Sequence, residues 1–309
     1  MLLRLLLLSF SLAWSGVSLA APQLAVPDVV KVNERVYALL GPVGMPDAHN
    51  QGYMVNTVAI LGDKGVVLVD TGFSDEVGRH IKAAIKKITD KPITHVINTH
   101  HHGDHVLGNS EFKGAEIIST EYCRDTVDKT GWDWVGILEQ MVGRKFPSTK
   151  PLTPTVSVAQ ETRTERTIHG VKLVLWAPPG SHTPGDLMLH LPDDKVLIAG
   201  DIIVSRMTPN LGDGNVGNWI GVLEEVKGMD LKTVIPGHGP LMTTQDVAVM
   251  HTRMQEFYAG VEKGYKEGLM DSEIRQTLDL SEWEKMVNFK ELMGVNINRA
   301  FLEAEQKNF

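Results

Sequence analysis

The chain has 309 residues, of which 42% are hydrophobic and 22% charged, and its formal net charge at pH 7 is −8. This composition is ordinary for a globular protein, and the acidic balance, without a basic cluster to offset it, argues against a nucleic-acid partner. The single cysteine, Cys123, excludes an internal disulfide, so stability must rest on the core or on bound metal. Cys123 lies in a helical-looking stretch, and we interpret it as a buried structural thiol rather than a reactive one.

The first twenty residues predict a secretory signal peptide. One arginine near the start is followed by a leucine-rich run and then by small residues, including Ser18 and Ala20, which predicts cleavage after Ala20. The alternative is a membrane anchor, but the apolar run at 5–14 has only about ten residues and a bilayer-spanning helix needs roughly 20. We therefore expect a periplasmic or secreted protein that comprises residues 21–309 and has no membrane association after cleavage.

Strands and helices are expected to alternate along the rest of the chain. Apolar and β-branched runs predict strands, in chain order, at 29–40, in both halves of a hairpin at 54–70, and at 93–98, 116–119, 167–176, 186–191, 195–200 and 233–236. Helical spacing predicts one helix that begins after Ser74. It predicts further helices at 121–141, at 218–227 and through most of 243–309. This order favours mixed sheets covered by helices in one α/β domain, with 243–309 as a helical tail packed on it.

The most informative segment follows the predicted strand at 93–98. It reads His100-His101-His102-Gly103-Asp104-His105 and holds four potential metal ligands within six residues. Residues two apart in an extended chain point to the same side, so His100 and His102 can hold one ion together. Gly103 permits a sharp turn, after which Asp104 and His105 can reach a second position. Imidazole and carboxylate are ligands that Zn²⁺ accepts, although a structural histidine-rich loop is the simpler alternative.

Three further candidates each lie directly after a strand or between two strands. His182 lies in a turn-rich segment, Asp201 ends the apolar run at 195–200, and His238 follows the strand at 233–236. Loops held at strand ends are where functional residues concentrate. We expect the remaining histidines to have surface or hydrogen-bonding roles rather than to bind metal; these are His49, His80, His95, His101, His169, His190 and His251.

These motifs resemble the metallo-β-lactamase fold superfamily, whose signature is HxHxDH followed by a single His, a single Asp and a last His. In addition, Asp70 in Val-Asp-Thr-Gly at 69–72 resembles the family's first motif, an aspartate that supports the metal loop from behind. The resemblance implies a four-layer αβ/βα sandwich with two zinc ions in a groove at one edge. It assigns one zinc to His100, His102 and His182, and the second to Asp104, His105 and His238, while Asp201 would bridge them.

What the resemblance implies chemically is hydrolysis by metal-bound hydroxide. Asp104 would both bind metal and orient the nucleophile, and Asp70 would fix an imidazole tautomer from behind. The bond would be of the ester, thioester, lactone or amide type in a small-molecule substrate. We propose Tyr53 and Trp219 as walls of the substrate groove.

Several alternatives stay open at this point. The histidine at position 102 departs from the HxExD pattern of diiron oxidoreductases, and Asp201 stands where well-known β-lactamases have a cysteine, so β-lactamase activity is the second choice. The overall pattern is closer to an exported group, with a bridging aspartate, associated with periplasmic quinoprotein or sulfur-oxidation systems. A non-catalytic zinc-binding partner protein is the third choice. Trp283, Met286, Phe289 and Leu292 in the tail have near-helical spacing and are expected to face the core.

Overall fold

The computed structural model describes residue 24 and residues 27–308. The predicted signal peptide at 1–20 lies outside the described residues. Within them, no helix combines the length and the apolar character needed to cross a membrane.

Two β-sheets form the centre of the molecule. The first has seven strands in the order of the chain: β1 (Asp28–Lys31), β2 (Val36–Leu40), β3 (Thr57–Leu61), β4 (Val66–Val69), β5 (Ile93–Ile97), β6 (Glu116–Thr120) and β7 (Val156–Val158). The second has five strands, in the order β12 (Thr233–Ile235), β11 (Val196–Ile198), β10 (Met188–Leu191), β9 (Val171–Ala177) and β8 (Thr162–Ile168). Both sheets are mixed, because β4 to β7 and the pair β11–β12 run parallel while the other pairs are antiparallel.

Side-chain alternation along the strands separates the layers. Val67 of β4 packs with Leu173 and Leu189 of the second sheet in the core between the two sheets. The next residue, Leu68, points to the opposite face and packs against Ile81 of α1 (Asp75–Lys86). Burying an aliphatic side chain of this size contributes about 1.5–3 kcal/mol relative to exposing it, so each sheet is held from both faces.

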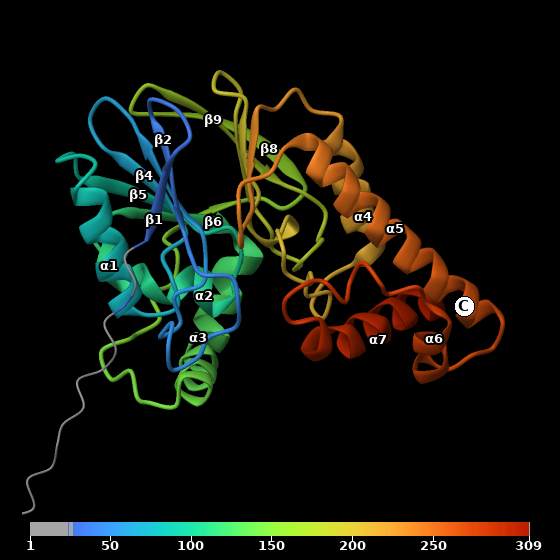
Figure 1. Ribbon diagram of the computed structural model, residues 1–309. Coiled ribbons are helices and arrows are strands. Elements are labelled where there is room, and N and C mark those ends of the chain that lie inside the picture. The colour runs from blue at the N-terminus through green and yellow to red at the C-terminus, as the bar shows by residue number, and fades with distance from the viewer. Residues whose placement is uncertain (1–23, 25–26, 309) are drawn as a thin grey trace, which may run out of the picture.

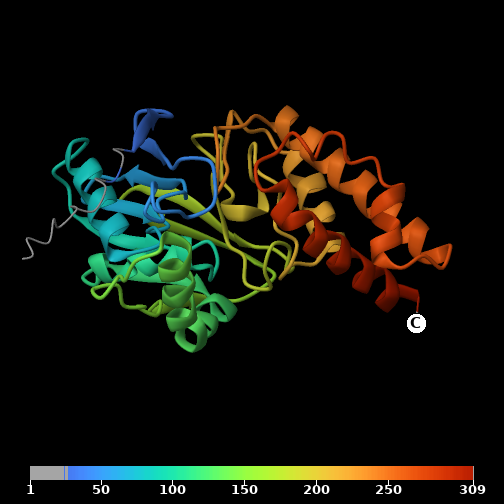
Figure 2. The same cartoon turned by 60° about the horizontal axis from the view of Figure 1, so that its bottom comes forward.

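Helices cover the outer faces of the sandwich. The side chains of α4 (Val216–Lys227), α5 (Thr244–Lys266) and α7 (Phe289–Asn308) share an apolar cluster with the outer face of the second sheet. The C-terminal helices, with the short α6 (Asp271–Thr277), lie on one side of the sheets, and α1 and α3 (Glu121–Val142) lie on the other (Figures 1 and 2). The predicted layered α/β sandwich is confirmed.

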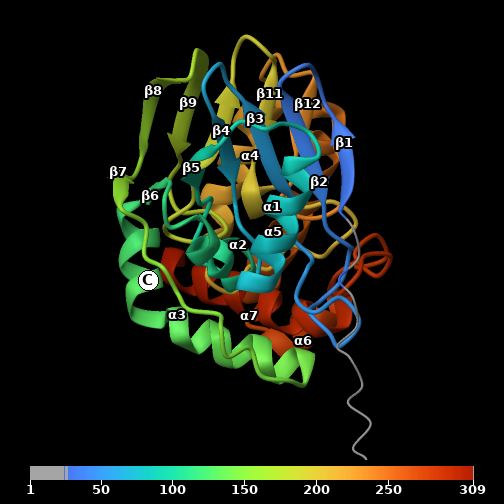
Figure 3. The ribbon, with the colours of Figure 1, turned by 90° about the vertical axis from the view of Figure 1, so that its left-hand side faces the viewer.

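Several short helical segments lie at one end of the sandwich. The helix α2 (Gly103–Val106) and the 3₁₀ turns η1 (Leu107–Phe112) and η2 (Gly200–Ile202) follow strands at this end. Figure 3 shows α3 and α7 at the same end of the strands as α2, so both helices border the loops that carry the candidate ligands.

Two of the predicted strands are wrong in their extent. The run at 29–40 is a pair of antiparallel strands, because the side chain of Asn33 accepts hydrogen bonds from the backbone N–H groups of Arg35 and Val36 and closes a turn between β1 and β2. The run at 167–176 likewise spans the end of β8 and most of β9, with a turn at His169 and Gly170, both in the left-handed region. In both places a short turn interrupts an apolar run.

The predicted environment of Cys123 is confirmed. Its side chain is fully buried with Val106 and Val127, and burial raises the pKa of the thiol to about 12. A thiol with such a pKa is a poor nucleophile near neutral pH.

Candidate metal centre

The seven proposed ligands lie on loops at the same end of both sheets. The segment from His100 to His105 follows β5 and enters α2, Asp201 follows β11 and His238 follows β12. Parallel pairing of β4 with β5, which has a register shift between Val66 and Val67, and of β11 with β12 brings the ends of these strands to the same edge. The structure brings the seven side chains into three groups with ligand atoms within 4.8 Å of one another: His100, His102 and His182; Asp104, His105 and His238; and His100, His105 and Asp201.

Each of the five imidazoles is held through its outer nitrogen, the ring nitrogen that points away from the centre. The outer contacts are His100 Nδ1 with Thr99 Oγ1 (3.1 Å), His102 Nε2 with Asp213 Oδ2 (3.0 Å), His105 Nδ1 with Asp70 Oδ2 (2.8 Å), His182 Nδ1 with the Asn210 carbonyl (3.1 Å) and His238 Nδ1 with the Met54 carbonyl (3.0 Å). A carbonyl or carboxylate only accepts, so the outer nitrogen of such a pair carries the proton and the ring is fixed in orientation.

The inner nitrogens converge on one small volume. His102 is turned the opposite way from the other rings, and its Nδ1 lies 3.1 Å from Nε2 of His182. Among the described residues, Nε2 of His100, Nε2 of His105 and Oδ1 of Asp201 are buried and have no hydrogen-bond partner. An unpartnered buried polar group costs about 1–3 kcal/mol, and metal ions would give these atoms partners, at His105 once the ring has released a proton. The donor set of imidazole and carboxylate therefore fits a pair of divalent metal ions.

Two carboxylates carry the negative charge of the centre. Burial disfavours their ionised forms, but His105 and His238 beside them hold the pKa values of Asp104 and Asp201 well below the ordinary value. Oδ2 of each carboxylate lies 3.2 Å from Nε2 of His238. Burial lowers the pKa of His238, yet the carboxylate of Asp201 and then that of Asp104 raise it to about 10.

The proposed ligand His182 has the opposite protonation behaviour. Burial, followed by the neighbouring imidazole of His102, lowers its pKa to about 3, so the ring is neutral. A neutral imidazole is ready to bind metal, whereas the protons held by His105 and His238 would be released on metal binding. The centre is thus a set of anionic and neutral donors that metal ions would complete.

Asp70 lies directly behind His105 and is buried. Its backbone is in the left-handed region, with φ of 58°. Oδ1 accepts a hydrogen bond from the backbone N–H of Thr99, and Oδ2 accepts from Thr99 Oγ1 and from His105 Nδ1, each at 2.8 Å. One carboxylate therefore fixes both the loop and the ring tautomer of a proposed ligand.

Sequence reasoning missed the other groups that hold the rings. Asp213 lies in the loop after η2, and its side chain is 56% exposed. Its position between two glycines in the loop after Asp201 is a weak signal, because exposed loop aspartates are common. The carbonyl groups of Met54 and Asn210 carry no side-chain signal at all.

Two glycines are required by close packing around the centre. A Cβ atom on Gly103 would come within 2.3 Å of the Phe73 ring, and one on Gly237 within 1.9 Å of Asp201 Oδ1. Gly103 begins α2 directly after the extended residue His102 and does so without a positive φ. The requirement for glycine there is space.

His101, between two ligands, was expected to point away from them. It is buried, its ring lies against that of Tyr122 with centroids 5.8 Å apart, and burial lowers its pKa to about 4. His101 also lies near Nε2 of His102 and Asp213, but Asp213 already engages that nitrogen.

A cavity of about 170 Å³ opens onto the centre and is lined by His102, Asp104, His182, Asp201 and His238. The expectation that Tyr53 and Trp219 form its walls is corrected. Tyr53 is buried in the core beside α1, and its hydroxyl donates to the carbonyl of Leu40. Trp219 is fully buried behind His182, and its Nε1 donates to the carbonyl of Ile202. Aromatic residues next to glycine-rich loops filled the core instead.

Comparisons with known proteins agree with this fold. A family model described as the metallo-beta-lactamase superfamily matches residues 50–238, which include all seven proposed ligands. The chain is 25% identical over 216 residues to the linear primary-alkylsulfatase of Pseudomonas sp. (strain ATCC 19151), an alignment that covers 58% of this chain and 40% of that protein. It is 26% identical over 215 residues to the metallo-beta-lactamase type 2 of Bacillus sp. (strain 170), with 67% and 73% covered.

A solved structure shares the fold. The metallo-beta-lactamase from Pontibacter korlensis superposes with a TM-score of 0.56 at 23% identity, covering 74% of this chain and 99% of that one. The chain belongs to the metallo-β-lactamase superfamily, whose members are hydrolases. It spans less than half the length of the alkylsulfatase, so that whole protein's activity is not transferred to it.

Proposed function

We propose that this protein is a two-zinc hydrolase that cleaves an ester-, thioester-, lactone- or amide-type bond in a small molecule. The observation that carries the proposal is the convergence of five outwardly anchored imidazoles and two carboxylates, with three buried atoms left without partners. His100, His102 and His182 would hold one ion, and Asp104, His105 and His238 the other. Asp201 would bridge them, since one of its oxygens lies 3.3 Å from His105 and the other 3.8 Å from His182.

Zinc ions bound in pairs lower the pKa of water toward neutrality and polarise a substrate carbonyl. The chain's own residues then do the positioning. Asp104 lines the cavity and stays ionised, so it can accept a hydrogen bond from the attacking water and orient it. Asp70 and Asp213 keep the rings of His105 and His102 in place during the reaction.

Cleavage of β-lactams is the second candidate. It is supported by the relative named metallo-beta-lactamase type 2, 73% of whose length is covered. Against it, β-lactam antibiotics carry a carboxylate beside the ring, and no Lys or Arg is among the described residues that line the cavity. The similarity to an alkylsulfatase makes sulfate esters a further class to assay.

The same proposal includes the location of the protein and the kind of molecule that it binds. The leader-like segment at 1–20 supports a periplasmic or secreted enzyme, and the net charge of −8 supports a small-molecule substrate rather than nucleic acid. A non-catalytic zinc-binding partner protein is the alternative that activity must exclude.

The test combines metal analysis with a substrate panel. We expect purified protein to bind two equivalents of zinc and to hydrolyse an ester, thioester or lactone with a kcat/KM above about 10⁴ M⁻¹s⁻¹ on its preferred class. A chromogenic β-lactam, an alkyl sulfate and an aryl phosphoester complete the panel. Binding of two zinc ions without turnover of any class would refute the hydrolase proposal and favour the partner protein.

A further inference from the structure

Much of the cavity wall beyond the proposed metal ligands is apolar. It includes Met45 from the loop after β2, Phe73 from the loop after β4, Trp134, Ile137 and Met141 from α3, and Leu292 from α7. Met45 and Ile137 are 37% and 38% exposed, so the apolar surface continues to the mouth of the cavity. Methionine side chains adapt their shape to a bound group. Segments far apart in the chain thus build one apolar wall facing the metal centre.

The same wall offers no cationic side chain to neutralise an anionic substituent. No Lys or Arg is among the cavity-lining residues that the structure describes, and Asp213, next to His102, adds negative charge near the cavity. A carboxylate placed away from the metal ions would lose water without gaining a cationic partner, which is unfavourable.

Two uncharged polar groups in the wall lack partners. Within the described residues, the Thr208 hydroxyl and the Asn288 side-chain Nδ2 are buried and make no hydrogen bond, and both residues line the cavity. A backbone hydrogen bond joins the segments that carry Thr208 and Asn288, because the N–H of Thr208 donates to the carbonyl of Val287 at 3.0 Å. Asn288 has a φ of 64°, a conformation that asparagine tolerates better than most residues. Buried polar groups left open at a functional site are candidates for binding a ligand.

We infer that the substrate is an ester-type compound that is uncharged beside the scissile bond, with a short apolar group against the α3 and α7 wall and a neutral oxygen bound by Thr208 and Asn288. This inference rests on the proposed hydrolytic function for its reaction. The cavity volume of about 170 Å³ is below the roughly 300 Å³ of common ligand pockets, so it holds a short chain.

The first test varies the length and then the charge of the acyl group. The zinc-loaded protein is assayed with p-nitrophenyl acetate, p-nitrophenyl butyrate and mono-p-nitrophenyl succinate. We expect kcat/KM to rise about fourfold per added CH₂ from acetate to butyrate and to fall at least about tenfold from butyrate to the anionic succinate ester. A succinate ester cleaved as fast as butyrate would overturn the inference and leave the hydrolase proposal intact.

Two exposed residues of α3 provide a matched pair of variants. Ile137→Lys places a cation at the cavity mouth, and we expect it to shift the butyrate-to-succinate ratio toward succinate by about tenfold. Trp132→Lys changes a residue of the same helix that is 64% exposed and does not line the cavity, so the ratio should be unchanged. Equal shifts in both variants would contradict recognition by this wall.

Thr208→Val tests the polar contact, because valine keeps the shape and removes the hydroxyl. Since the hydroxyl has no partner in the free protein, we expect an unchanged unfolding midpoint and a roughly tenfold higher KM, with little change in kcat. A lower midpoint with unchanged KM would assign Thr208 a structural role and refute its part in recognition.

A binding readout separates this inference from the hydrolytic proposal. Calorimetry with acetohydroxamate, butyrohydroxamate and the monohydroxamate of succinate needs no turnover. Tighter binding of butyrohydroxamate, with the succinate derivative weaker, supports the apolar wall even if no ester is hydrolysed and the proposed function fails. Equal affinities would overturn the inference whatever the activity.

Discussion

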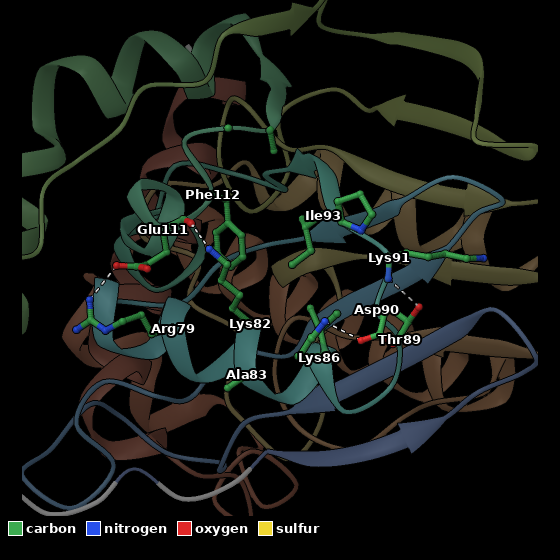
Figure 4. Close-up of a pocket in the computed structure, with 14 residues that line it drawn as sticks. Arg79, Lys82, Ala83, Lys86, Thr89, Asp90, Lys91, Ile93, Glu111 and Phe112 are labelled. Carbon is green, nitrogen blue, oxygen red and sulfur yellow. Dashed lines mark hydrogen bonds and ion pairs between the residues drawn. The ribbon is translucent and has the colours of Figure 1, made fainter.

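The candidate metal centre and the hollow beside α1 are two concavities of the described residues that differ in kind. The hollow, between α1 and the segments around Lys91 and Phe112, has a volume of about 700 Å³, against about 170 Å³ for the cavity at the metal centre. Most of its charged groups pair with each other, as Arg79 does with Glu111 at 2.8 Å and Lys86 with Asp90 at 2.6 Å (Figure 4), while Lys82 and Lys91 donate to backbone carbonyls.

The smaller cavity has the opposite character. Nε2 of His100, Nε2 of His105 and Oδ1 of Asp201 are buried, close to one another and without hydrogen-bond partners among the described residues. A large hollow whose charges pair in water needs no ligand, whereas buried polar atoms without partners favour one. Cavity volume alone would not select the candidate metal centre, whereas the cluster of buried atoms without partners singles it out as the better candidate.

The variant His105→Ala is expected to have the largest effect on activity. It removes a ligand of the proposed second ion and the partner of Asp70, so we expect kcat/KM on the preferred substrate to fall by about 10²–10⁴-fold. The measurement is steady-state kinetics together with zinc content by atomic absorption. Full turnover in this variant would show that the reaction does not use the proposed centre.

Metal removal comes next in expected effect. With free zinc about a thousandfold above its dissociation constant, bound metal adds about 4 kcal/mol to the free energy of unfolding. We therefore expect a chelator to lower the unfolding midpoint by about 10 °C, and zinc, but not magnesium, to restore it. An unchanged midpoint would mean that the converging imidazoles hold no ion in the folded protein.

Asp70→Ala tests the support behind His105 and should weaken zinc binding by about 10–100-fold. It leaves His105 Nδ1 and the Thr99 backbone N–H without their acceptor. Asp70→Asn is the matched variant, because asparagine tolerates the positive φ at this position and keeps an acceptor oxygen. Competition with a chromophoric chelator measures both variants. Equal zinc affinity in wild type and Asp70→Ala would contradict a positioning role.

The sequence predicted the parts of this molecule that depend on periodicity and spacing. The hairpin of β3 and β4, the helix after Ser74 and the layered architecture follow from apolar alternation and a capping serine, whose side chain accepts from the Val77 N–H. The ligand residues at 100–105 are adjacent in the chain, so their proximity needs no knowledge of the fold. Short turns inside apolar runs, as at Asn33, were missed.

Long-range packing explains what could not be predicted at the site. Tyr53 and Trp219 carry no periodic signal, and only the fold decides that they fill the core. In the stripe expected to face the core, Trp283 does so, but Leu292 lines the cavity, because α7 reaches the end of the sandwich where the loops converge. The backbone carbonyls that fix His182 and His238 are invisible to any reading of side chains.

A smaller effect is expected at Asp213, whose carboxylate engages His102 from an exposed loop. Because water and salt weaken an exposed contact of this kind, we expect Asp213→Asn to reduce zinc affinity by about tenfold or less, below the loss in Asp70→Ala. The same chelator competition ranks the two variants. A larger loss at Asp213 than at Asp70 would reverse the order that burial predicts.

The variant Lys86→Ala tests the hollow beside α1, and we expect almost no effect on zinc binding, activity or stability. Lys86 and Asp90 are 69% and 91% exposed, so each is already well solvated and the pair contributes little to stability. Zinc content, kcat/KM and the unfolding midpoint should all equal the wild-type values, measured in parallel with His105→Ala. Because the hollow is larger than the metal cavity and its charges already have partners, altered turnover in Lys86→Ala would show that paired surface charge can also mark a functional site. Unchanged turnover would leave unpartnered buried atoms as the better criterion in this fold.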